Sequence, residues 1–579
     1  MRTCARGLMM VAVLLVAGLG VLAQVRTSPP VTAVTPVTEA MLRNPTPADW
    51  LHSRRTYEGW SYSPLDQINR QNVGQLQLAW SWAMQPGNQQ ASPIVHDGVM
   101  YVANPGSTVQ ALNAATGDLL WEYRREFPEA IRAQAEMRAI RGLSIYDDKV
   151  FLNTADGHLV ALNTGTGRVV WDVEVAASGQ RQYFSAPSLV VRGKVLSGLQ
   201  GCEYFVPQKC AITAHDAATG KELWRTSTIA RPGEPGGDSW GDVALLYRAG
   251  ADAWITGSYD PTLNLVYWST AQAKPWSRAA RGTDGDALYS NTLLALDPDT
   301  GKIVWHNQLL PGETHDMDEV FENILVDVGP RKSLFKMGKL GILWQLDRQT
   351  GRFVSAEDLG YQNIVRVDRA TGKVTYRPGM IPTLGQTIDF CPSTAGFKSW
   401  RAMAFHPETR AFYIPMLLTC EQGSFTDVQK VEGGGGLGQG RRQDRYHPES
   451  PDALAQFVAM DSATGRLLWV QRQRAPFNTA ALTTGGGLVF VGDWNRYINA
   501  YDTASGKLLW QNRLTTSPQG FPISYSIRGR QYVAVPVGIG AASWGTSIPI
   551  VLAPDIKRPS GGNAIFVFAL QESTTALPK

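Results

Sequence analysis

One repeated motif limits the fold of this 579-residue chain more than any other feature. In each copy an alternating apolar segment leads into a turn of the form Asp/Asn-x-x-Thr/Ser-Gly, and a second segment ends in tryptophan. The clear copies are "ALNAATGDLLW" ending at Trp121, "ALNTGTGRVVW" at Trp171, "AHDAATGKELW" at Trp224, "ALDPDTGKIVW" at Trp305, "AMDSATGRLLW" at Trp469 and "AYDTASGKLLW" at Trp510. Because glycine adopts positive φ without strain, each copy predicts a β-hairpin.

A further pair of strands precedes most of these hairpins, as in "SPIVHDGVMYVAN" and "APSLVVRGKVLSGL". Four strands per unit, at a period of roughly 40 to 55 residues, are typical of a β-propeller, whose radial packing protects sheet edges. With the weaker copies included, the pattern predicts an all-β fold, an eight-bladed β-propeller with four-stranded antiparallel blades. Each tryptophan would dock on the next blade and donate its indole N–H to a backbone carbonyl. A series of unrelated hairpin domains is the alternative.

The N-terminus predicts export. The apolar run "GLMMVAVLLVAGLGVLA" follows two arginines, which predicts a signal peptide over residues 1–23 and a periplasmic protein. An uncleaved membrane anchor is the alternative, although the run is short for a full span. We expect a flexible segment over 24–47, one propeller domain over 48–575 with a flexible loop over the glycine-rich stretch 431–450, and no membrane span after signal cleavage.

Charge and cysteine content exclude several classes of protein. A net charge of +4 with interspersed signs offers no basic stripe, so we expect no nucleic-acid partner. Cys4 lies in the leader, which leaves Cys202, Cys210, Cys391 and Cys420 in an oxidising compartment. Proximity in sequence suggests disulfides 202–210 and 391–420, with buried thiols as the alternative for the first pair. No CxxC or CxxCH is present, so neither a zinc site nor a covalently attached haem is predicted.

Longer stretches carry a specific resemblance. These are "GWSYSPLDQINRQNVGQLQLAWSW", "GSYDPTLNLVYWST" and "GDWNRYINAYDTASGKLLWQNRL". Together with the hairpins they resemble the pyrroloquinoline quinone (PQQ) dependent alcohol dehydrogenases, the methanol and ethanol dehydrogenase family, in its soluble type without a haem domain. The resemblance runs from about residue 48 to about residue 572. It implies oxidation of an alcohol to an aldehyde or ketone by hydride transfer to metal-bound PQQ, with electrons passed to a separate soluble cytochrome c. A non-catalytic propeller scaffold for envelope protein assembly is the alternative.

The cofactor requires particular surroundings. PQQ is a planar ortho-quinone with three carboxylates, so its site needs flat apolar surfaces, cationic or hydroxyl partners and a Lewis acid. The resemblance assigns the stacking floor to Trp254 and a carboxylate contact to Ser185. It also implies that Arg141 reaches the cofactor, where its planar fork suits a carboxylate or carbonyl edge. It places Lys339 beside the quinone oxygens as a catalytic and cofactor-binding cation. The other cofactor-binding residues that it implies are Gln200, Gly201, Cys202 and Trp494.

A metal ion is implied by the carboxylates. Glu203 in "GCEYF" matches the family's metal ligand, and Asp316 in "ETHDMDEV" matches the catalytic aspartate that accepts the alcohol proton. Asp318 stands two residues further on, and alternate residues of an extended segment face the same side. Within the family this extra carboxylate marks enzymes that prefer a lanthanide, and a trivalent ion tolerates crowded negative ligands. We therefore expect one lanthanide ion, with Ca²⁺ as the alternative. A solvated acidic loop is the alternative for the motif in isolation.

The sequence also departs from the family pattern. Gln272 stands where the family offers a metal-binding Asn, one methylene longer, and is retained as a candidate ligand. Ala135 and Glu136 replace the family's adjacent cysteine pair, Gln90 replaces a common Glu, and Ser399 replaces a common Asn. The identity of the alcohol, sugar or polymer substrate stays open. So does the oligomeric state, for which a homodimer is one option.

Overall fold

The computed structural model describes residues 34–176, 181–538, 540 and 544–571. The predicted signal peptide over 1–23 lies outside the described residues. Helices are few and short in the described part. They are α1 (Glu39–Arg43), α2 (Glu129–Met137), α3 (Arg278–Arg281) and α4 (Ile548–Leu552), with 3₁₀ turns at Val73–Gln75, Pro105–Ser107, Gly237–Trp240, Leu245–Tyr247 and Trp544–Thr546. Because the repeats encode hairpins, nearly all remaining regular structure is β-strand.

Antiparallel meanders of four strands recur along the chain. The first contains β3 (Ile94–His96), β4 (Val99–Asn104), β5 (Thr108–Asn113) and β6 (Leu119–Arg124). The second contains β7 (Ser144–Tyr146), β8 (Lys149–Asn153), β9 (His158–Asn163) and β10 (Val169–Glu174). The third contains β11 (Leu189–Val191), β12 (Lys194–Gly198), β13 (Ala211–Asp216) and β14 (Glu222–Ser227). The fourth contains β16 (Ser258–Asp260), β17 (Leu265–Ser269), β19 (Thr292–Leu296) and β20 (Ile303–Gln308).

The second half of the chain repeats this order. One sheet contains β21 (Asn323–Val328), β22 (Arg331–Met337), β23 (Ile342–Asp347) and β24 (Phe353–Asp358). The next contains β28 (Ala404–His406), β29 (Ala411–Leu417), β32 (Ala455–Asp461) and β33 (Leu467–Gln473). A third contains β34 (Leu482–Thr484), β35 (Leu488–Gly492), β36 (Tyr497–Asp502) and β37 (Leu508–Arg513), to which β1 (Tyr62–Ser63) adds in parallel.

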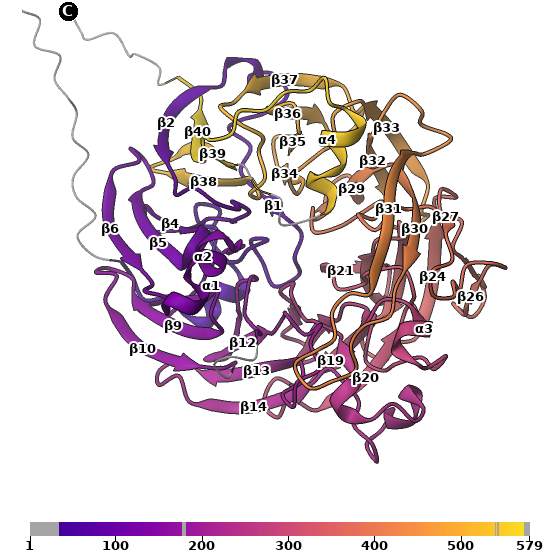
Figure 1. Cartoon of the computed structure of the whole chain (residues 1–579). Coiled ribbons are helices and arrows are strands. Elements are labelled where there is room, and N and C mark those ends of the chain that lie inside the picture. Colours follow the sequence, from indigo (N-terminus) through magenta and orange to yellow (C-terminus); the bar gives the residue numbers. More distant parts are fainter. Residues whose placement is uncertain (1–33, 177–180, 539, 541–543, 572–579) are drawn as a thin grey trace, which may run out of the picture. The chain divides into compact units, whose positions relative to one another are not determined.

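The last sheet joins segments from both ends of the repeat region. Strands β38 (Ile523–Ile527), β39 (Arg530–Val537) and β40 (Ala564–Ala569) are completed by β2 (Gln77–Ala83), which pairs antiparallel with β40. Within the unit Val31–Lys579, Figure 1 shows consecutive sheets side by side in chain order, with the yellow and indigo ends of the colour scale meeting in this sheet. The apolar segments "AWSWAMQ" and "NAIFVFAL" therefore share one sheet, although they lie near opposite ends of the described chain. The fold is an all-β propeller.

Contacts between neighbouring sheets involve the repeated tryptophans. The indole N–H of Trp121 donates to the carbonyl of Thr164 at 2.9 Å, and that of Trp224 to Pro298 at 3.0 Å. A Cβ on Gly167 would lie 2.5 Å from the Trp121 ring, so the turn glycine leaves room for the indole. The indole N–H of Trp305 differs, since it is buried without a partner.

Burial distinguishes inner from outer strands. Every residue of β4 and β5 is buried, because both faces of these strands pack against neighbouring sheets. The tryptophan-bearing strand β6 alternates between exposed and half-buried positions, as expected at the periphery. The described helices include none that is long and apolar enough to cross a membrane.

Two expectations of flexibility are corrected. Within 24–47, the described part from residue 34 contains α1, and Val37 pairs with Asp147 and is only 1% exposed. Within 431–450, β31 (Gln439–Tyr446) forms a hairpin with β30 (Thr419–Phe425), which also pairs with β27 (Ile388–Phe390). In both cases contacts with distant segments order a stretch whose local composition is that of a loop.

Two short pairs of strands complete the described β-structure. They are β15 (Ala249–Gly250) with β18 (Ala273–Lys274), and β25 (Val365–Val367) with β26 (Val374–Tyr376).

Both predicted disulfides are present. Cys202 is bonded to Cys210 and Cys391 to Cys420. Cys391–Cys420 joins the segment after β27 to β30. Cys202–Cys210 closes the loop between β12 and β13, which contains Glu203. The alternative of buried thiols at 202 and 210 is therefore excluded.

Candidate active site

A cavity of ≈ 440 Å³ lies where loops from several sheets meet. This is within the size range of small-molecule and cofactor sites. Its lining includes most of the residues selected from the sequence: Arg141, Ser185, Gln200, Gly201, Glu203, Trp254, Gln272, Asp316, Asp318 and Lys339. These positions span almost 200 residues of sequence, so only the arrangement of the sheets brings them together.

The acidic stretch 313–320 is buried throughout. Asp316 and Asp318 are 2% and 5% exposed, which rules out the alternative of a solvated acidic loop. The Lys339 Nζ lies 3.0 Å from the Asp316 Oδ2 and 2.9 Å from the Asp318 Oδ2, so both carboxylates face one ammonium. Asp316 has a φ of 70°, a left-handed conformation that is uncommon for a residue with a side chain. Such backbone strain is frequent at functional sites.

Burial and neighbouring charges alter the protonation of Asp316. Burial raises the pKa of Asp316 well above its ordinary value, and the neighbouring Asp318 carboxylate adds to this, while the Lys339 ammonium opposes it. Burial alone would lower the pKa of Lys339, but the two carboxylates outweigh burial and raise it. An additional cation in contact with Asp316 and Asp318 would therefore favour the ionised form of Asp316.

Gln272 offers a free oxygen beside these carboxylates. Its side-chain nitrogen donates to the Asp316 Oδ1, and its backbone N–H donates to the Asp318 Oδ1 at 3.3 Å. The Gln272 Oε1 is buried without a hydrogen-bond partner. Leaving a buried acceptor unpaired costs about 1–3 kcal/mol, which a bound ligand would recover. Carboxylate and amide oxygens are the donors that hard cations prefer, so these residues fit a metal ion of that class.

An aromatic surface and a cation adjoin the acidic cluster. The Arg141 guanidinium lies 4.9 Å from the centre of the half-buried Trp254 ring, and it also donates to the Ser185 Oγ. The Ser185 hydroxyl in turn donates to the Gln200 Oε1 at 2.8 Å. Burial lowers the pKa of Arg141 to about 10, and its Nε has no partner. A flat ring with an incompletely bonded cation at its side suits a planar ligand with carboxylates.

Two predicted cofactor contacts lie elsewhere. Cys202 does not line the cavity, and its sulfur is bonded to Cys210. Trp494 is 2% exposed and also outside the lining, with the Arg558 guanidinium 3.5 Å from its ring centre. Of the departures noted in the sequence, Ser399 lines the cavity. Gln90 does not line it, although both of its amide atoms are buried without partners.

A helix occupies the position at which the family has its adjacent cysteine pair. Ala135 and Glu136 lie on α2, and the residues that follow it, Arg138 and Ala139, line the cavity. Arg138 packs its guanidinium 3.5 Å from the centre of the Tyr183 ring, which is also part of the lining.

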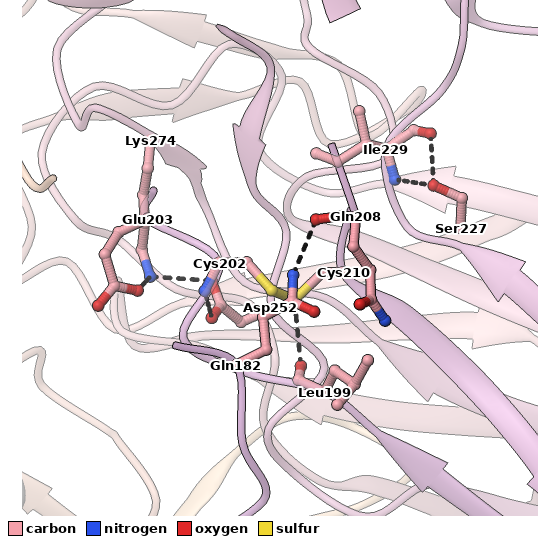
Figure 2. The surroundings of a disulfide bond; sticks show 10 residues. All are labelled: Gln182, Leu199, Cys202, Glu203, Gln208, Cys210, Ser227, Ile229, Asp252 and Lys274. Carbon is pink, nitrogen blue, oxygen red and sulfur yellow. Dashed lines mark hydrogen bonds and ion pairs between the residues drawn. A yellow bond between two sulfur atoms is a disulfide. The ribbon is translucent and has the colours of Figure 1, made fainter. Parts of the chain in front are cut away.

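Sequence reasoning missed a buried ion pair. The Lys274 Nζ lies 2.8 Å from the Asp252 Oδ2 and 3.5 Å from the Glu203 Oε2. Figure 2 shows these three side chains beside the Cys202–Cys210 disulfide. The signal was available, because Lys274 stands two residues after Gln272 and Asp252 stands two residues before Trp254. Alternation along extended segments therefore places each of them on the side of a residue already selected.

Comparisons with known proteins identify relatives of this chain. The chain matches the family described as "Glucose/ethanol/alcohol dehydrogenase, beta-propeller domain" over residues 50–356 and 470–533. It is 32% identical to the quinohemoprotein alcohol dehydrogenase ADH IIB of Pseudomonas putida over 90% of this chain and 77% of that protein. It is also 32% identical to the quinoprotein alcohol dehydrogenase PedH of Pseudomonas putida, over 89% of each.

A solved structure extends the match to three dimensions. The europium-containing methanol dehydrogenase superposes with a TM-score of 0.85 at 27% identity, covering 92% of this chain and 99% of that one. The buried acidic cluster, the aromatic surface and these similarities lead to one conclusion: the chain belongs to the PQQ-dependent alcohol dehydrogenase family.

Proposed function

We propose that this chain is a periplasmic dehydrogenase that oxidises an alcohol to an aldehyde or ketone with PQQ and a metal ion, and passes the electrons to a separate cytochrome c. The observation that carries the proposal is the convergence of Asp316 and Asp318 on Lys339 in one cavity, with Gln272, whose Oε1 is unpaired, bonded to both carboxylates. A scaffold gains nothing from burying such a cluster, since each unpaired polar group reduces stability. The names of relatives as quinoprotein dehydrogenases or dehydrogenase subunits support the same assignment.

We assign the metal to Glu203, Gln272, Asp316 and Asp318. All four line the cavity and present oxygen atoms. We infer a lanthanide ion, with Ca²⁺ as the alternative, because three carboxylates around one ion suit a trivalent charge. The europium-containing methanol dehydrogenase among the structural matches is compatible with that choice.

We assign the cofactor to the aromatic side of the cavity. Trp254 would support the ring system, while Arg141, Ser185, Gln200 and Gly201 would meet its polar edge. Cys202 would act from behind, through the loop that its disulfide closes, and Trp494 through packing. When bound in this cavity, PQQ would supply a two-electron acceptor and the metal ion would supply a Lewis acid.

The chain's own groups would handle the proton and exclude water. Asp316, once ionised by the neighbouring cation, accepts the proton of the substrate hydroxyl. Lys339 holds Asp316 in place through both the carboxylate and the backbone carbonyl, to which its Nζ donates at 2.7 Å. The burial of stretch 313–320 keeps bulk water from that carboxylate.

We also infer that the described sheets act as eight blades of a single domain over 48–575, following a signal peptide. Eight sheets of four or five strands in the described ranges support that count. The indole bonds of Trp121 and Trp224 support docking between neighbouring blades.

The test is reconstitution. Purified protein receives PQQ with La³⁺ or with Ca²⁺, and dye-linked oxidation of a series of short alcohols is recorded. Asp316→Asn should lose at least about 100-fold in turnover, the usual contribution of a general base. Asp368→Asn, in an exposed turn outside the cavity, is the matched control and should keep wild-type turnover. Absence of turnover with either metal, together with capture of an envelope protein, would favour the scaffold.

A further inference from the structure

A buried ammonium shares the carboxylates that we assign to the metal. Lys274 is 9% exposed, and its Nζ contacts both Asp252 and Glu203, as Figure 2 shows. A second lysine of the same cavity, Lys339, contacts Asp316 and Asp318. The inference below concerns Lys274 and rests on the proposed metal site.

The backbone holds this lysine in place. Lys274 belongs to β18, where it pairs with Ala249 of β15. Its partner Asp252 is held as well, because the Asp252 Oδ1 accepts the backbone N–H of Cys202 at 3.1 Å, next to the Cys202–Cys210 disulfide. The ammonium is therefore tied to the loop that presents Glu203.

Two carboxylates face the Lys274 ammonium. Its Nζ lies 2.8 Å from the Asp252 Oδ2 and 3.5 Å from the Glu203 Oε2, so the buried ammonium is compensated by direct ion pairs. The ammonium thus lies against Glu203, one of the carboxylates that we assign to the metal.

The Lys274 ammonium repels ions of different charge to different extents. The repulsion between an ammonium and a metal ion held by the same carboxylate grows in proportion to the charge of the ion. It therefore penalises a trivalent ion more than a divalent one. Asp252 offsets part of the effect, and its Oδ2 is occupied by Lys274 rather than open to the metal.

We propose that Lys274, held by Asp252 against Glu203, is a specificity-determining residue that limits the preference of the metal site for trivalent over divalent cations. Asp318 and Lys274 then act in opposite directions, the first favouring a higher ionic charge and the second a lower one. Removal of the lysine should increase discrimination in favour of a lanthanide.

The experiment measures ion binding without turnover. Tb³⁺ affinity of the full chain is followed by luminescence sensitised by Trp254 and Trp276, which line the cavity, and Ca²⁺ affinity by competition. Lys274→Met should raise the ratio of Tb³⁺ to Ca²⁺ affinity at least about tenfold, and Lys274→Arg should leave it near that of wild type. Asp252→Asn, which frees the ammonium for Glu203, should lower the ratio. The double variant should lie between the single variants.

A matched control is available. Lys149 is 8% exposed and contacts two aspartates, Asp147 and Asp148, outside the cavity. Lys149→Met should leave the ratio unchanged. If Lys274→Met does not fold, as judged by near-ultraviolet circular dichroism, Asp252→Asn and Lys274→Arg still carry the test.

Different results would overturn the proposed metal site and the proposed role of Lys274. An equal change in Tb³⁺ and Ca²⁺ affinity in Lys274→Met, or an unchanged ratio in both Lys274→Met and Asp252→Asn, overturns the role of Lys274 and leaves the metal site intact. Wild-type protein that binds neither ion, with or without PQQ, overturns both the metal site and this inference.

Discussion

At the scale of single residues, burial determines the chemistry of the acidic stretch. Asp316 and Asp318 would be ordinary acids in water, but in the cavity they share Lys339 and lie beside the free oxygen of Gln272. Two carboxylates held together in a buried site repel each other unless cations compensate. A metal ion is the compensation that fits these donors.

Removal of Asp318 should change which ion is preferred. In Asp318→Ala the site loses one negative charge and one pair of oxygen atoms, so the binding of a trivalent ion suffers more than that of Ca²⁺. We expect the ratio of Tb³⁺ to Ca²⁺ affinity to fall at least about tenfold, measured by sensitised luminescence and competition. Asp260→Asn, whose carboxylate pairs with Arg348 away from the cavity, is the control. An unchanged ratio in Asp318→Ala would contradict a ligand role.

His215 on β13 should make stability depend on pH. It is 2% exposed, and burial lowers its pKa from 6.5 to about 4, with Glu222 opposing the shift. The unfolded chain binds a proton near pH 6.5 and the folded chain only near pH 4. The contribution of neutral His215 is therefore complete above pH 6.5 and is lost as the pH falls towards 4, by on the order of 3 kcal/mol.

The measurement is urea unfolding at pH 7 and pH 5. His215→Gln should show a smaller loss of unfolding free energy between the two pH values than wild type does. An identical loss in both proteins would mean that His215 is not a source of the acid sensitivity.

At the scale of elements, the turn glycines serve the sheet interface as well as the turn. Gly167 has a φ of 68°, and its missing side chain makes room for Trp121 of the preceding sheet. Conformation and packing therefore select the same residue. This explains why the hairpin motif couples its glycine to a tryptophan one repeat earlier.

Two substitutions separate the cost of backbone strain at a turn glycine from the cost of a clash with the indole. Gly233 has a φ of 80° but open space where a Cβ would be, so Gly233→Ala should cost only the backbone strain, about 1 kcal/mol. Gly167→Ala adds a clash at 2.5 Å with the indole and should cost about 1–3 kcal/mol more. Denaturant unfolding of both variants measures the difference. Equal losses would show that the indole adjusts without cost.

At the scale of the whole molecule, one sheet is shared by distant parts of the chain. In it Gln77 pairs with Ala569, and β40 lies between β2 and β39. Closure therefore depends on contacts nearly 500 residues apart, for which the entropic cost of loop closure is substantial. The buried strand β40 compensates through pairing on both edges.

Proline substitutions in β40 and β2 test how far stability depends on the pairing of β40. Val567→Pro removes a ladder hydrogen bond and clashes within a central strand, with an expected loss of about 3 kcal/mol or more in unfolding free energy. Ala79→Pro lies where the β2 register shifts, on an edge strand, and should be tolerated better. Thermal unfolding and limited proteolysis compare the two. Similar behaviour of both variants would argue against β40 as the closing element.

Local sequence determined much of this protein. Periodicity and turn chemistry predicted the hairpins ending at Trp121 and Trp224, because a turn and its flanking strands depend on neighbours in the chain. Cysteine spacing predicted both disulfides. The resemblance to the family singled out Asp316, Asp318, Trp254 and Lys339 as candidate site residues, and all four line one cavity.

Tertiary structure decided the rest. Only the packing of sheets showed that Trp494 lies under Arg558, that Gln439–Tyr446 is a strand, and that Lys274 reaches Glu203. These outcomes depend on which distant segments become neighbours and on how much water remains between them. Local patterns encode neither quantity, because burial and partner choice are properties of the closed fold.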